Sequence, residues 1–466
     1  MSDQPYRATL DRLVARRRFG LKPGLEAIRA VLAELGNPER SFRSVHVTGS
    51  KGKGSVASMA ASILTASGRR TGLFTSPHLR SFRERIRVDG EPIPPAAVVD
   101  GVARIEAASD ALRSRGALER ELTFFEVATA LAFDHFRAKA VDAAVVEVGI
   151  GGRLDSTNVL DSAVGVLTTV ELEHTEILGP TVGDIAREKA GILHRGMIGI
   201  LGRLPPAALV EVERAADAVG VPLWHLGKEI DVTDRELTPR GQRFTVRTPR
   251  RTLERLSIPL FGNFQPGNAA LAVAAAEAFL RASGAELPET AIRRGLSKAA
   301  WPGRLERVAR RPDLWVDVAH TPESALALAQ SLAEIAPFAT PEENVVVFGC
   351  LADKNADGIF DALSELAQTV VVTSVRSERT ARPEELRRRA VGRFRRVVVA
   401  PSVSDALPLA RAATGTDGFT LVTGSDYLVG EVLELVEGTS RDEPDLSDPG
   451  RPGSEAVPSP ASDGPR

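Results

Sequence analysis

The sequence has a single cysteine, no long apolar run and no excess of either charge. Cys350 has no partner for an intrachain disulfide, and its apolar neighbours Val345–Gly349 indicate a buried structural thiol rather than a nucleophile. A net charge of −2 excludes a strongly basic face for nucleic acid or an anionic membrane. Residues 1–18 lack the apolar stretch of a signal peptide, and no later segment is long enough to span a bilayer. We therefore expect a cytoplasmic protein with neither a nucleic-acid nor a membrane partner.

The length of 466 residues and the hydrophobic fraction of 43% are those of a soluble chain with two or three domains. From Gly438 onward, Ser, Asp, Pro and Gly dominate and almost no large apolar residue remains. Such a composition cannot bury a core, so residues 439–466 are predicted to be a disordered tail.

Short β-branched runs alternate with Ala-rich helical stretches in two series, which is typical of parallel sheets covered by helices on both faces. The predicted fold class is therefore α/β: a P-loop-type parallel-sheet ATPase domain over residues 1–299, then a smaller Rossmann-like α/β domain over residues 300–438. A Thr- and Arg-rich β insert is predicted over residues 221–262. The first series of predicted strands is Ser44–Thr48, Thr71–Thr75, Ala143–Val148, Val164–Val170 and Met197–Leu201. The second is Leu314–Val318, Asn344–Phe348, Thr369–Val375, Arg396–Ala400 and Phe419–Thr423.

A glycine-rich turn follows the first predicted strand and precedes a helix predicted to start near Ser55. Glycines 49, 52 and 54 allow the backbone to curl so that its amides face phosphate oxygens, and the helix N-terminus adds its dipole. Lys53 has the length to reach the β- and γ-phosphates of a nucleotide. The segment predicts a phosphate-binding loop, and the alternative is a flexible surface turn. Its nucleotide-binding candidates are Gly49, Ser50, Lys51, Gly52, Lys53, Gly54 and Ser55.

Glu147 stands at the end of a buried predicted strand, on the sheet edge that carries the phosphate loop. Mg²⁺ needs a hard oxygen ligand at such a place, and the alternative is a surface carboxylate. Other polar motifs follow predicted strands or precede predicted helices, but taken alone they do not indicate a function. They are Thr75–Leu79, Gly149–Asn158, Glu173–His174, Arg187–Gly191, Trp301–Glu306 and Asp317–Pro322.

Together these motifs resemble the folylpolyglutamate synthase/dihydrofolate synthase branch of the Mur ligase superfamily, over nearly the whole chain to about residue 437. The resemblance rests on the Gly49–Ser55 loop and the motifs above, together with Gly20–Leu25 and Leu35–Pro38. It implies an ATP-dependent ligase that adds L-glutamate to a folate or dihydropteroate carboxylate through an acyl phosphate. It also implies a monomer with ATP bound between its two domains.

The resemblance further implies roles for single residues. Ser76 and Glu147 are implied to bind one magnesium ion and His174 a second, supported by a carbamylated Lys189 rather than a solvated helix lysine. Gln265 and Asn268 are implied to lie on the nucleotide side, although Asn268 is equally interpretable as a helix cap. Arg304 is implied to reach the γ-phosphate and Asp317 the ribose, and His320 is implied to contact either the γ-phosphate or the acyl phosphate. Candidate contacts of glutamate are Ser374 and Arg382, and those of the pterin are Phe124–Glu126 and Gly151–Asn158.

The chain departs from the family pattern at four positions. Lys51 stands where bacterial members commonly have Asn, Glu173 where Asp is usual, Val318 where Gly is usual, and Asn355 replaces the last acid of an Asp-Lys-Asp motif. Lys51 is similar to the residue of the eukaryotic-type enzymes, whereas the departures at Glu173, Val318 and Asn355 keep open a Mur-type ligase for a different acid and amine. A regulatory protein with a degenerate nucleotide site and a P-loop kinase are further alternatives.

Overall fold

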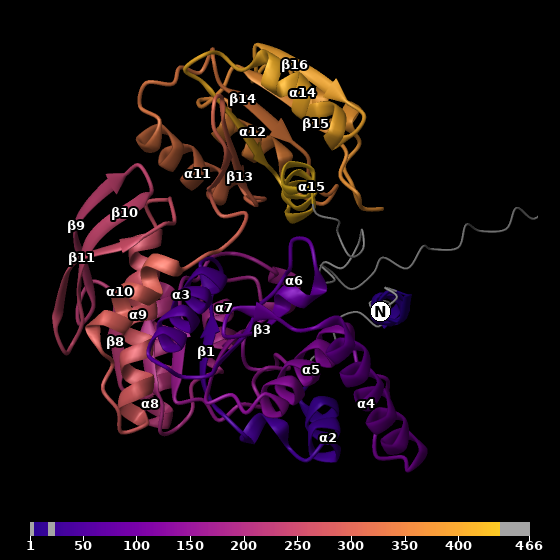
Figure 1. Ribbon diagram of the computed structural model, residues 1–466, viewed down its shortest axis with the longest axis vertical. Coiled ribbons are helices and arrows are strands. Elements are labelled where there is room, and N and C mark those ends of the chain that lie inside the picture. Colours follow the sequence, from indigo (N-terminus) through magenta and orange to yellow (C-terminus); the bar gives the residue numbers. More distant parts are fainter. Residues whose placement is uncertain (1–3, 17–23, 439–466) are drawn as a thin grey trace, which may run out of the picture.

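The computed structural model describes residues 4–16 and 24–438. The predicted tail, 439–466, lies outside the described residues, as do the first residues of the Gly20–Leu25 motif. Figure 1 shows two α/β bodies, one above the other. The chain passes from the lower to the upper body between α10 (Glu289–Lys298) and β12 (Glu306–Ala309).

The lower body is built on an eight-stranded sheet with the order β4-β3-β2-β5-β1-β6-β7-β8. In this spatial order, the six strands β2, β5, β1, β6, β7 and β8 are parallel to one another. Strands β3 and β4 add an antiparallel edge next to β2. The strands are β1 (Arg43–Thr48), β2 (Thr71–Phe74), β3 (Ile86–Val88), β4 (Glu91–Pro92), β5 (Ala143–Glu147), β6 (Val164–Leu167), β7 (Ile198–Leu201) and β8 (Leu223–His225).

Alternate residues of these strands enter different cores, as the pleat requires. Val145 of β5 packs in the core beneath α3, whereas its neighbours Ala144 and Val146 pack beneath α5. Both faces are therefore apolar and both are covered by helices (Figure 1). The first face carries α3 (Lys53–Ala66), α9 (Gln265–Ala282) and α10. The second carries α1 (Gln4–Ala15), α2 (Glu26–Glu34), α4 (Pro95–Ser114), α5 (Phe124–Ala138), α7 (Val182–Ala190) and α8 (Pro206–Val219), with the short α6 (Thr175–Leu178) nearby.

The predicted insert, residues 221–262, is not a single unit. Its first strand joins the large sheet as β8, and the rest forms a three-stranded antiparallel sheet with the order β11-β10-β9. These strands are β9 (Asp231–Thr238), β10 (Gly241–Arg247) and β11 (Thr252–Ile258). Apolar residues of β10 and β11 face α9 and extend the first core, so the small sheet is anchored to the lower body.

The upper body has a six-stranded sheet with the order β12-β13-β17-β14-β15-β16, in which only β12 is antiparallel to its neighbour. The predicted α/β fold with two largely parallel sheets is confirmed. Cys350 is buried behind this sheet, and burial raises the pKa of its thiol to about 12, as expected for a structural thiol. The remaining strands are β13 (Asp313–Asp317), β14 (Val345–Phe348), β15 (Thr369–Thr373), β16 (Arg396–Ala400) and β17 (Phe419–Thr423). The helices are α11 (Pro322–Ile335), α12 (Ala356–Leu363), α13 (Pro383–Ala390), α14 (Val403–Ala413) and α15 (Asp426–Glu437).

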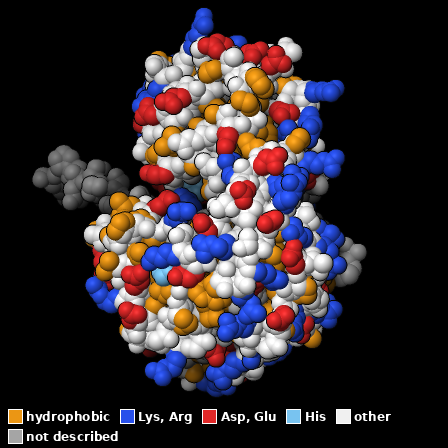
Figure 2. Space-filling view, turned by 90° about the vertical axis from the view of Figure 1, so that its left-hand side faces the viewer, with side chains coloured by type: hydrophobic (Ala, Val, Ile, Leu, Met, Phe, Trp, Pro, Cys, Tyr) orange, Lys and Arg blue, Asp and Glu red, His pale blue; other side chains and the backbone are white. Residues whose placement is uncertain are grey.

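The two bodies touch on both sides of the linker. Arg235 of β9 forms a two-pronged ion pair with Glu334 of α11, at 2.6 and 2.8 Å. On the other side, Arg80 of the lower body pairs with Glu437, the last residue of α15. Figure 2 shows that the molecule narrows between the bodies and that charges of both signs are mixed over the visible face. Among the described residues, no helix is long and apolar enough to cross a membrane.

Candidate active site

The phosphate loop joins β1 to α3 at the carboxyl end of the large sheet. Gly49 and Gly52 have φ angles of 143° and 82°. A Cβ atom at Gly49 would lie 2.0 Å from Thr168 Oγ1, and one at Gly52 would lie 2.8 Å from Asn268 Oδ1. Both positions therefore require glycine, for the backbone conformation and for the close approach.

Gly54 serves a different purpose from the one predicted. It lies in the first turn of α3 without a positive φ angle, so the expectation that it helps the loop to curl is wrong. The helix begins at Lys53, before the predicted start near Ser55. The missing side chain instead leaves room for the indole of Trp301.

The segment after β6 supports the loop through hydrogen bonds. The amide of Ser50 donates to the carbonyl of Thr169 at 2.9 Å, and the amide of Lys51 donates to the Thr169 hydroxyl at 2.9 Å. The hydroxyl of Thr168 donates to the carbonyl of Lys51 at 2.5 Å. The loop is thus held open in a fixed shape by residues more than a hundred positions away in the sequence. No local sequence pattern could have predicted these contacts.

Lys53 folds back over this loop. Its Nζ donates to the carbonyl of Gly49 at 2.8 Å and to that of Ser50 at 3.4 Å. Neutral carbonyls are weaker partners for an ammonium than phosphate oxygens, so the lysine is poised for an anionic ligand. Lys51 adds a second, half-buried cation, whose pKa is lowered by burial although nearby Glu173 opposes the shift.

Helix α9 braces the loop from behind. Gln265 is fully buried, and its Nε2 donates to Ser55 Oγ at 3.3 Å. Asn268 Nδ2 donates in turn to Gln265 Oε1 at 3.1 Å. The helix begins at Gln265 after the N-cap residue Phe264, so the interpretation of Asn268 as a helix cap is wrong. Both side chains lie against the nucleotide loop, and their direct contact with a nucleotide stays a prediction.

Two of the predicted metal ligands lie together beside the loop. The amide of Ser76, just after β2, donates to Glu147 Oε2 at 3.1 Å, and Glu147 ends the neighbouring strand β5. Mg²⁺ takes few ligands from a protein and completes its shell with water and phosphate oxygens. No group of three His, Cys, Asp or Glu side chains within residues 4–16 and 24–438 could hold a metal unaided. A hydroxyl and a carboxylate beside a phosphate loop fit an ion that is shared with a nucleotide.

The turn after Ser76 is held by Glu84 and Arg85, for which no role was predicted. The carboxylate of Glu84 accepts hydrogen bonds from the backbone amides of residues 79, 80 and 81. The fully buried Arg85 donates from Nε to Nδ1 of His78 at 2.8 Å and lies over the ring of Phe124. The alternation of arginine and glutamate over residues 83–85 is a local sequence signal for this arrangement.

Lys189 is buried and paired with Glu173, so the alternative of a solvated helix lysine is wrong. Its Nζ lies 2.9 Å from Glu173 Oε1. Burial lowers the pKa of Lys189 to about 8, against the opposing pull of Glu173. Burial alone would raise the pKa of Glu173, but Lys189 and Lys53 hold it at about 2. His174 follows directly with a φ of 48° and an exposed side chain at the start of α6.

The Gly149–Asn158 loop is organised by Asp155. Its two carboxylate oxygens accept the amides of Gly149 and Ile150 on one side and the amide and hydroxyl of Thr157 on the other. Because the Thr157 hydroxyl donates to Asp155, His46 Nε2 donates to that hydroxyl, at 2.8 Å. His46 lies in the middle of β1 and was not identified as a site residue from the sequence.

His46 predicts a pH dependence of stability. Burial lowers the pKa of His46 from 6.5 to about 3. Below pH 6.5 the histidine is therefore protonated in the unfolded chain but stays neutral in the folded protein until the pH approaches 3. The stability that His46 contributes is present above pH 6.5 and is lost as the pH falls toward 3. Between pH 7 and pH 5 the loss should be about 2 kcal/mol. Urea unfolding at both pH values should show a smaller difference for His46→Asn than for the wild type; an equal difference would contradict this assignment.

The upper body contributes Arg304, which follows the linker. The neighbouring residues Gly303 and Leu305 both have positive φ angles, 71° and 44°. Asp317 holds the strained turn: its Oδ2 accepts the amide of Leu305 at 2.7 Å and its Oδ1 accepts that of Ala319 at 2.8 Å. Burial raises the pKa of Asp317, with Arg304 opposing. This carboxylate therefore positions Arg304 and the segment leading to His320.

His320 is a neutral side chain in this environment. Burial lowers its pKa to about 4, and its Nδ1 lies 3.0 Å from the carbonyl of Val318. A carbonyl only accepts, so Nδ1 carries the proton and Nε2 keeps its lone pair. A Cβ atom at Gly303 would lie 3.3 Å from Val318 Cγ1, so Gly303 leaves room for the valine that stands where the family usually has glycine.

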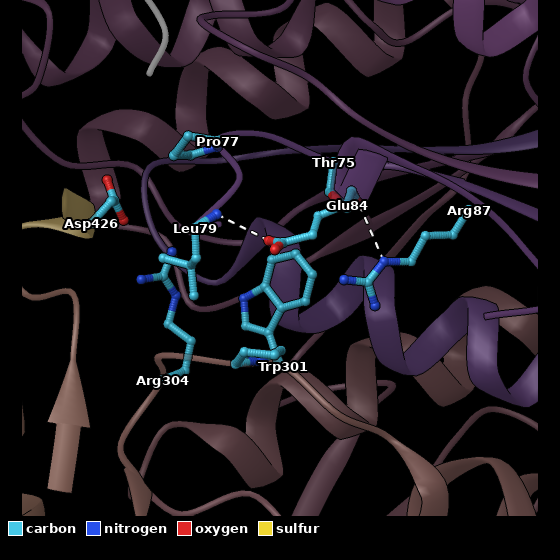
Figure 3. Close-up of a pocket in the computed structure, with 9 residues that line it drawn as sticks. Thr75, Pro77, Leu79, Glu84, Arg87, Trp301, Arg304 and Asp426 are labelled. Atoms are coloured by element: carbon cyan, nitrogen blue, oxygen red, sulfur yellow. Dashed lines mark hydrogen bonds between the residues drawn. The ribbon is translucent and has the colours of Figure 1, made fainter. Parts of the chain in front are cut away.

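A pocket between the bodies contains Arg304 (Figure 3). Trp301 lies at its centre, with Arg304 and Asp426 toward one side and Arg87 toward the other. The lining residues are Thr75, Pro77, Leu79, Glu84, Arg87, Trp301, Pro302, Arg304 and Asp426. Elements of both bodies thus converge on the carboxyl ends of the two sheets, where ligands bind in open α/β folds.

The remaining candidates are more scattered. Phe124 is buried in the core, whereas Phe125 packs beside Phe74 and next to Gly149 of the Asp155 loop. The Ser374 hydroxyl donates to the carbonyl of Pro401, and Arg382 is exposed at the N-cap of α13. Asn355 caps α12 by accepting the amide of Gly358 at 3.1 Å, a role that the aspartate of the family pattern would fill equally well.

Comparison with known proteins identifies the family. Residues 47–276 match the Mur ligase middle domain, and residues 303–426 match the Mur ligase glutamate ligase domain. The chain is 39% identical to the folylpolyglutamate synthase of Lacticaseibacillus casei, over 77% of this chain and 82% of that protein. It is 38% identical to the dihydrofolate synthase/folylpolyglutamate synthase of Mycobacterium tuberculosis, over 84% and 82%. A solved folylpolyglutamate synthase complex with AMPPCP and folate has a TM-score of 0.80 at 35% identity, over 92% and 99%.

The chain belongs to the folylpolyglutamate synthase/dihydrofolate synthase family. It is therefore an acid–amino-acid ligase of the Mur ligase type, as the sequence motifs predicted. Within this family of ATP-dependent ligases, the matched middle domain carries the phosphate loop, Ser76, Glu147 and Lys189. The matched glutamate ligase domain carries Arg304, Asp317 and His320.

Proposed function

We propose that the protein adds L-glutamate to the carboxylate of folates, and of dihydropteroate, with the conversion of ATP to ADP and phosphate. The observation that carries this function is the proximity of Arg304 and His320 of the upper body to Lys51 of the phosphate loop, in a chain that belongs to this ligase family. Besides burial, the charge of Arg304 lowers the pKa of Lys51, and the charge of Lys51 lowers the pKa of His320. ATP binds between the bodies, with its phosphates at the loop.

The reaction has two steps. A carboxylate oxygen of the pterin substrate attacks the γ-phosphorus, the bond to the β-phosphate oxygen breaks, and an acyl phosphate and ADP form. The amine nitrogen of glutamate then attacks the acyl carbon, and the carbon–oxygen bond to phosphate breaks, which leaves an amide. Lys53 and Arg304 stabilise the charge that shifts among the phosphate oxygens in the first step. Positioning by the closed bodies supplies most of the remaining acceleration.

His320 acts in the second step. The incoming amine is an ammonium in solution and must lose a proton before it can attack. A neutral imidazole whose Nε2 holds a lone pair can accept a hydrogen bond from an N–H of the amine and orient the amine toward the acyl carbon, because the carbonyl of Val318 fixes the tautomer. With a pKa of about 4, His320 is too weak a base to keep the proton of an ammonium, so that proton passes to water.

Magnesium fits the same geometry. Ser76 and Glu147 would hold one ion next to the phosphate loop, and His174 and Lys189 would hold a second. Such ions would supply positive charge that neutralises the phosphate oxygens of a bound nucleotide. Lys189 carries a carbamate in the active form. With a pKa of about 8, roughly one lysine in ten is neutral at pH 7 and able to capture carbon dioxide.

The function is tested by ATP turnover with Mg²⁺, glutamate and either dihydropteroate or tetrahydrofolate, each component being omitted in turn. We expect ADP formation only when both acid and amine are present, together with a product that is heavier by one glutamyl residue. The pterin that is consumed shows which of the two family activities this chain has.

Two other outcomes would contradict the proposal in different ways. ATP binding without glutamylation of either pterin would retain the ligase site but exclude these substrates. It would favour a Mur-type ligase for another acid and amine, the alternative that the departures at Glu173, Val318 and Asn355 keep open. A stable phosphorylated product without amide formation would indicate a kinase instead.

A further inference from the structure

Trp301, the first residue of the Trp-Pro-Gly turn between the two bodies, rests directly on the phosphate-loop helix. A Cβ atom built on Gly54 would lie 2.2 Å from Cζ2 and 2.7 Å from Cε2 of its indole. Gly54 is buried and immediately follows Lys53. Helical glycine is intrinsically unfavourable compared with alanine, so its use in the first turn of α3 calls for a steric reason, and the indole supplies one.

The backbone leading to Trp301 is fastened to the same helix. The hydroxyl of Ser58 donates to the carbonyl of Ala300 at 2.8 Å, and that of Ser62 donates to the carbonyl of Gly295 at 2.7 Å. Both hydroxyls project from α3, one and two turns beyond Gly54. The lower end of the linker therefore moves with the phosphate loop rather than with the upper body.

The upper end of the linker is fastened to the other body. Glu306 accepts the amide of Gly303 at 2.8 Å, and the amide of Val318 donates to the carbonyl of Gly303 at 3.1 Å. Asp317 holds Leu305 in its strained conformation. Arg304 consequently stands on a turn that is rigid with respect to the upper sheet.

Only Trp301 and Pro302 lie between these two anchored ends. Figure 3 shows the indole in the middle of the pocket between Arg304 and Arg87. We propose that Trp301 is a positioning residue: its indole, seated on Gly54, acts as a spacer that sets the approach of Arg304 to a nucleotide bound at the phosphate loop. The proposal rests on the proposed function, because it assigns Arg304 to the phosphoryl-transfer step.

A double-mutant cycle of Gly54→Ala and Trp301→Leu tests the contact, with two readouts for each protein. One is the Kd for ADP with Mg²⁺, measured by calorimetry, and the other is kcat for glutamate ligation. In Trp301→Leu, Arg304 is misplaced while the loop is intact, so kcat should fall about thirtyfold and the ADP Kd should change less than about threefold.

Gly54→Ala forces the indole out of its seat and strains the loop. Alone it should raise the ADP Kd about tenfold or more, and in the Trp301→Leu background, where leucine leaves space for the new methyl group, its effect should fall below about threefold. An equal effect of Gly54→Ala in both backgrounds would overturn the spacer, because the loss would then belong to the loop itself. A wild-type kcat in Trp301→Leu would also overturn the proposal that Trp301 is a spacer. If Gly54→Ala does not fold, the kcat of Trp301→Leu alone decides between the outcomes.

Gly183→Ala is the matched control. Gly183 is the second residue of α7, as Gly54 is of α3, but a Cβ there would meet its nearest neighbours at an ordinary 3.7 Å. The ADP Kd and the kcat of Gly183→Ala should equal those of the wild type. Thermal unfolding of every variant shows whether a loss of binding or activity comes from a local change or from loss of the folded state. The ADP readout needs no turnover, so a wild-type protein that binds ADP without glutamylating a pterin would refute the proposed function and leave this cycle standing.

Discussion

Lys53→Ala is expected to reduce turnover by at least about a thousandfold, which corresponds to about 4 kcal/mol of transition-state stabilisation. The ammonium lies within the phosphate loop, held by the carbonyls of Gly49 and Ser50, and a bound triphosphate offers it a far stronger partner. Alanine removes the charge and leaves the loop backbone, whose shape depends on Thr168 and Thr169, unchanged. Initial rates of ADP release at saturating substrates measure the effect.

Lys51→Ala provides the comparison within the same loop. Lys51 is also a cation near the phosphates, but its backbone groups, not its side chain, make its hydrogen bonds to Thr168 and Thr169. Its removal should reduce turnover about tenfold or less, since bound phosphate keeps Lys53 and Arg304. Both variants should retain the wild-type melting temperature. Near-normal turnover in Lys53→Ala would refute the assignment of the loop.

Buried strands were the most predictable part of the fold. Runs such as Val345–Phe348 and Thr369–Thr373 consist of β-branched and aromatic residues because both of their faces are covered, so the sequence marks them almost to the residue. The edge strands β3 and β4 have only three and two residues, too few to show a pattern, and were not predicted. Leu223–His225 was assigned to the wrong sheet, because three residues of β propensity do not reveal which neighbour they pair with.

The site was predictable where its residues lie at the ends of local elements. Lys53 and Glu147 follow or end buried strands, and a strand followed by a glycine-rich turn has a recognisable sequence. The partners of these residues were not predictable, because they come from distant segments. Gly54 was correctly noticed, but its reason, Trp301, is almost 250 residues away; the hydrogen bond between His46 and Thr157 likewise depends on the register of the sheet.

Loss of the side chain of Lys189 is expected to have the second-largest effect, a decrease in turnover of about a hundredfold or more in Lys189→Ala. The variant loses the group proposed to carry the carbamate, and it leaves Glu173 partly buried without its partner at 2.9 Å. A small carboxylate such as acetate or propionate can occupy the space of the missing side chain and restore the negative charge. Turnover should therefore recover in part as acetate is added, and chloride at the same ionic strength should have no effect.

Two further variants separate the carbamate from the ion pair. Lys189→Arg keeps a cation for Glu173 but cannot capture carbon dioxide, so it should be as inactive as Lys189→Ala if the carbamate is the working form. The wild type should also lose activity in carbon dioxide-depleted buffer and regain it with bicarbonate, because a carbamate forms only from the neutral amine and dissolved gas. Full activity of Lys189→Arg, with no response to acetate or bicarbonate, would instead assign Lys189 to the ion pair observed with Glu173. The extra methylene of glutamate would then have a function of its own, since it lets the carboxylate reach the lysine directly.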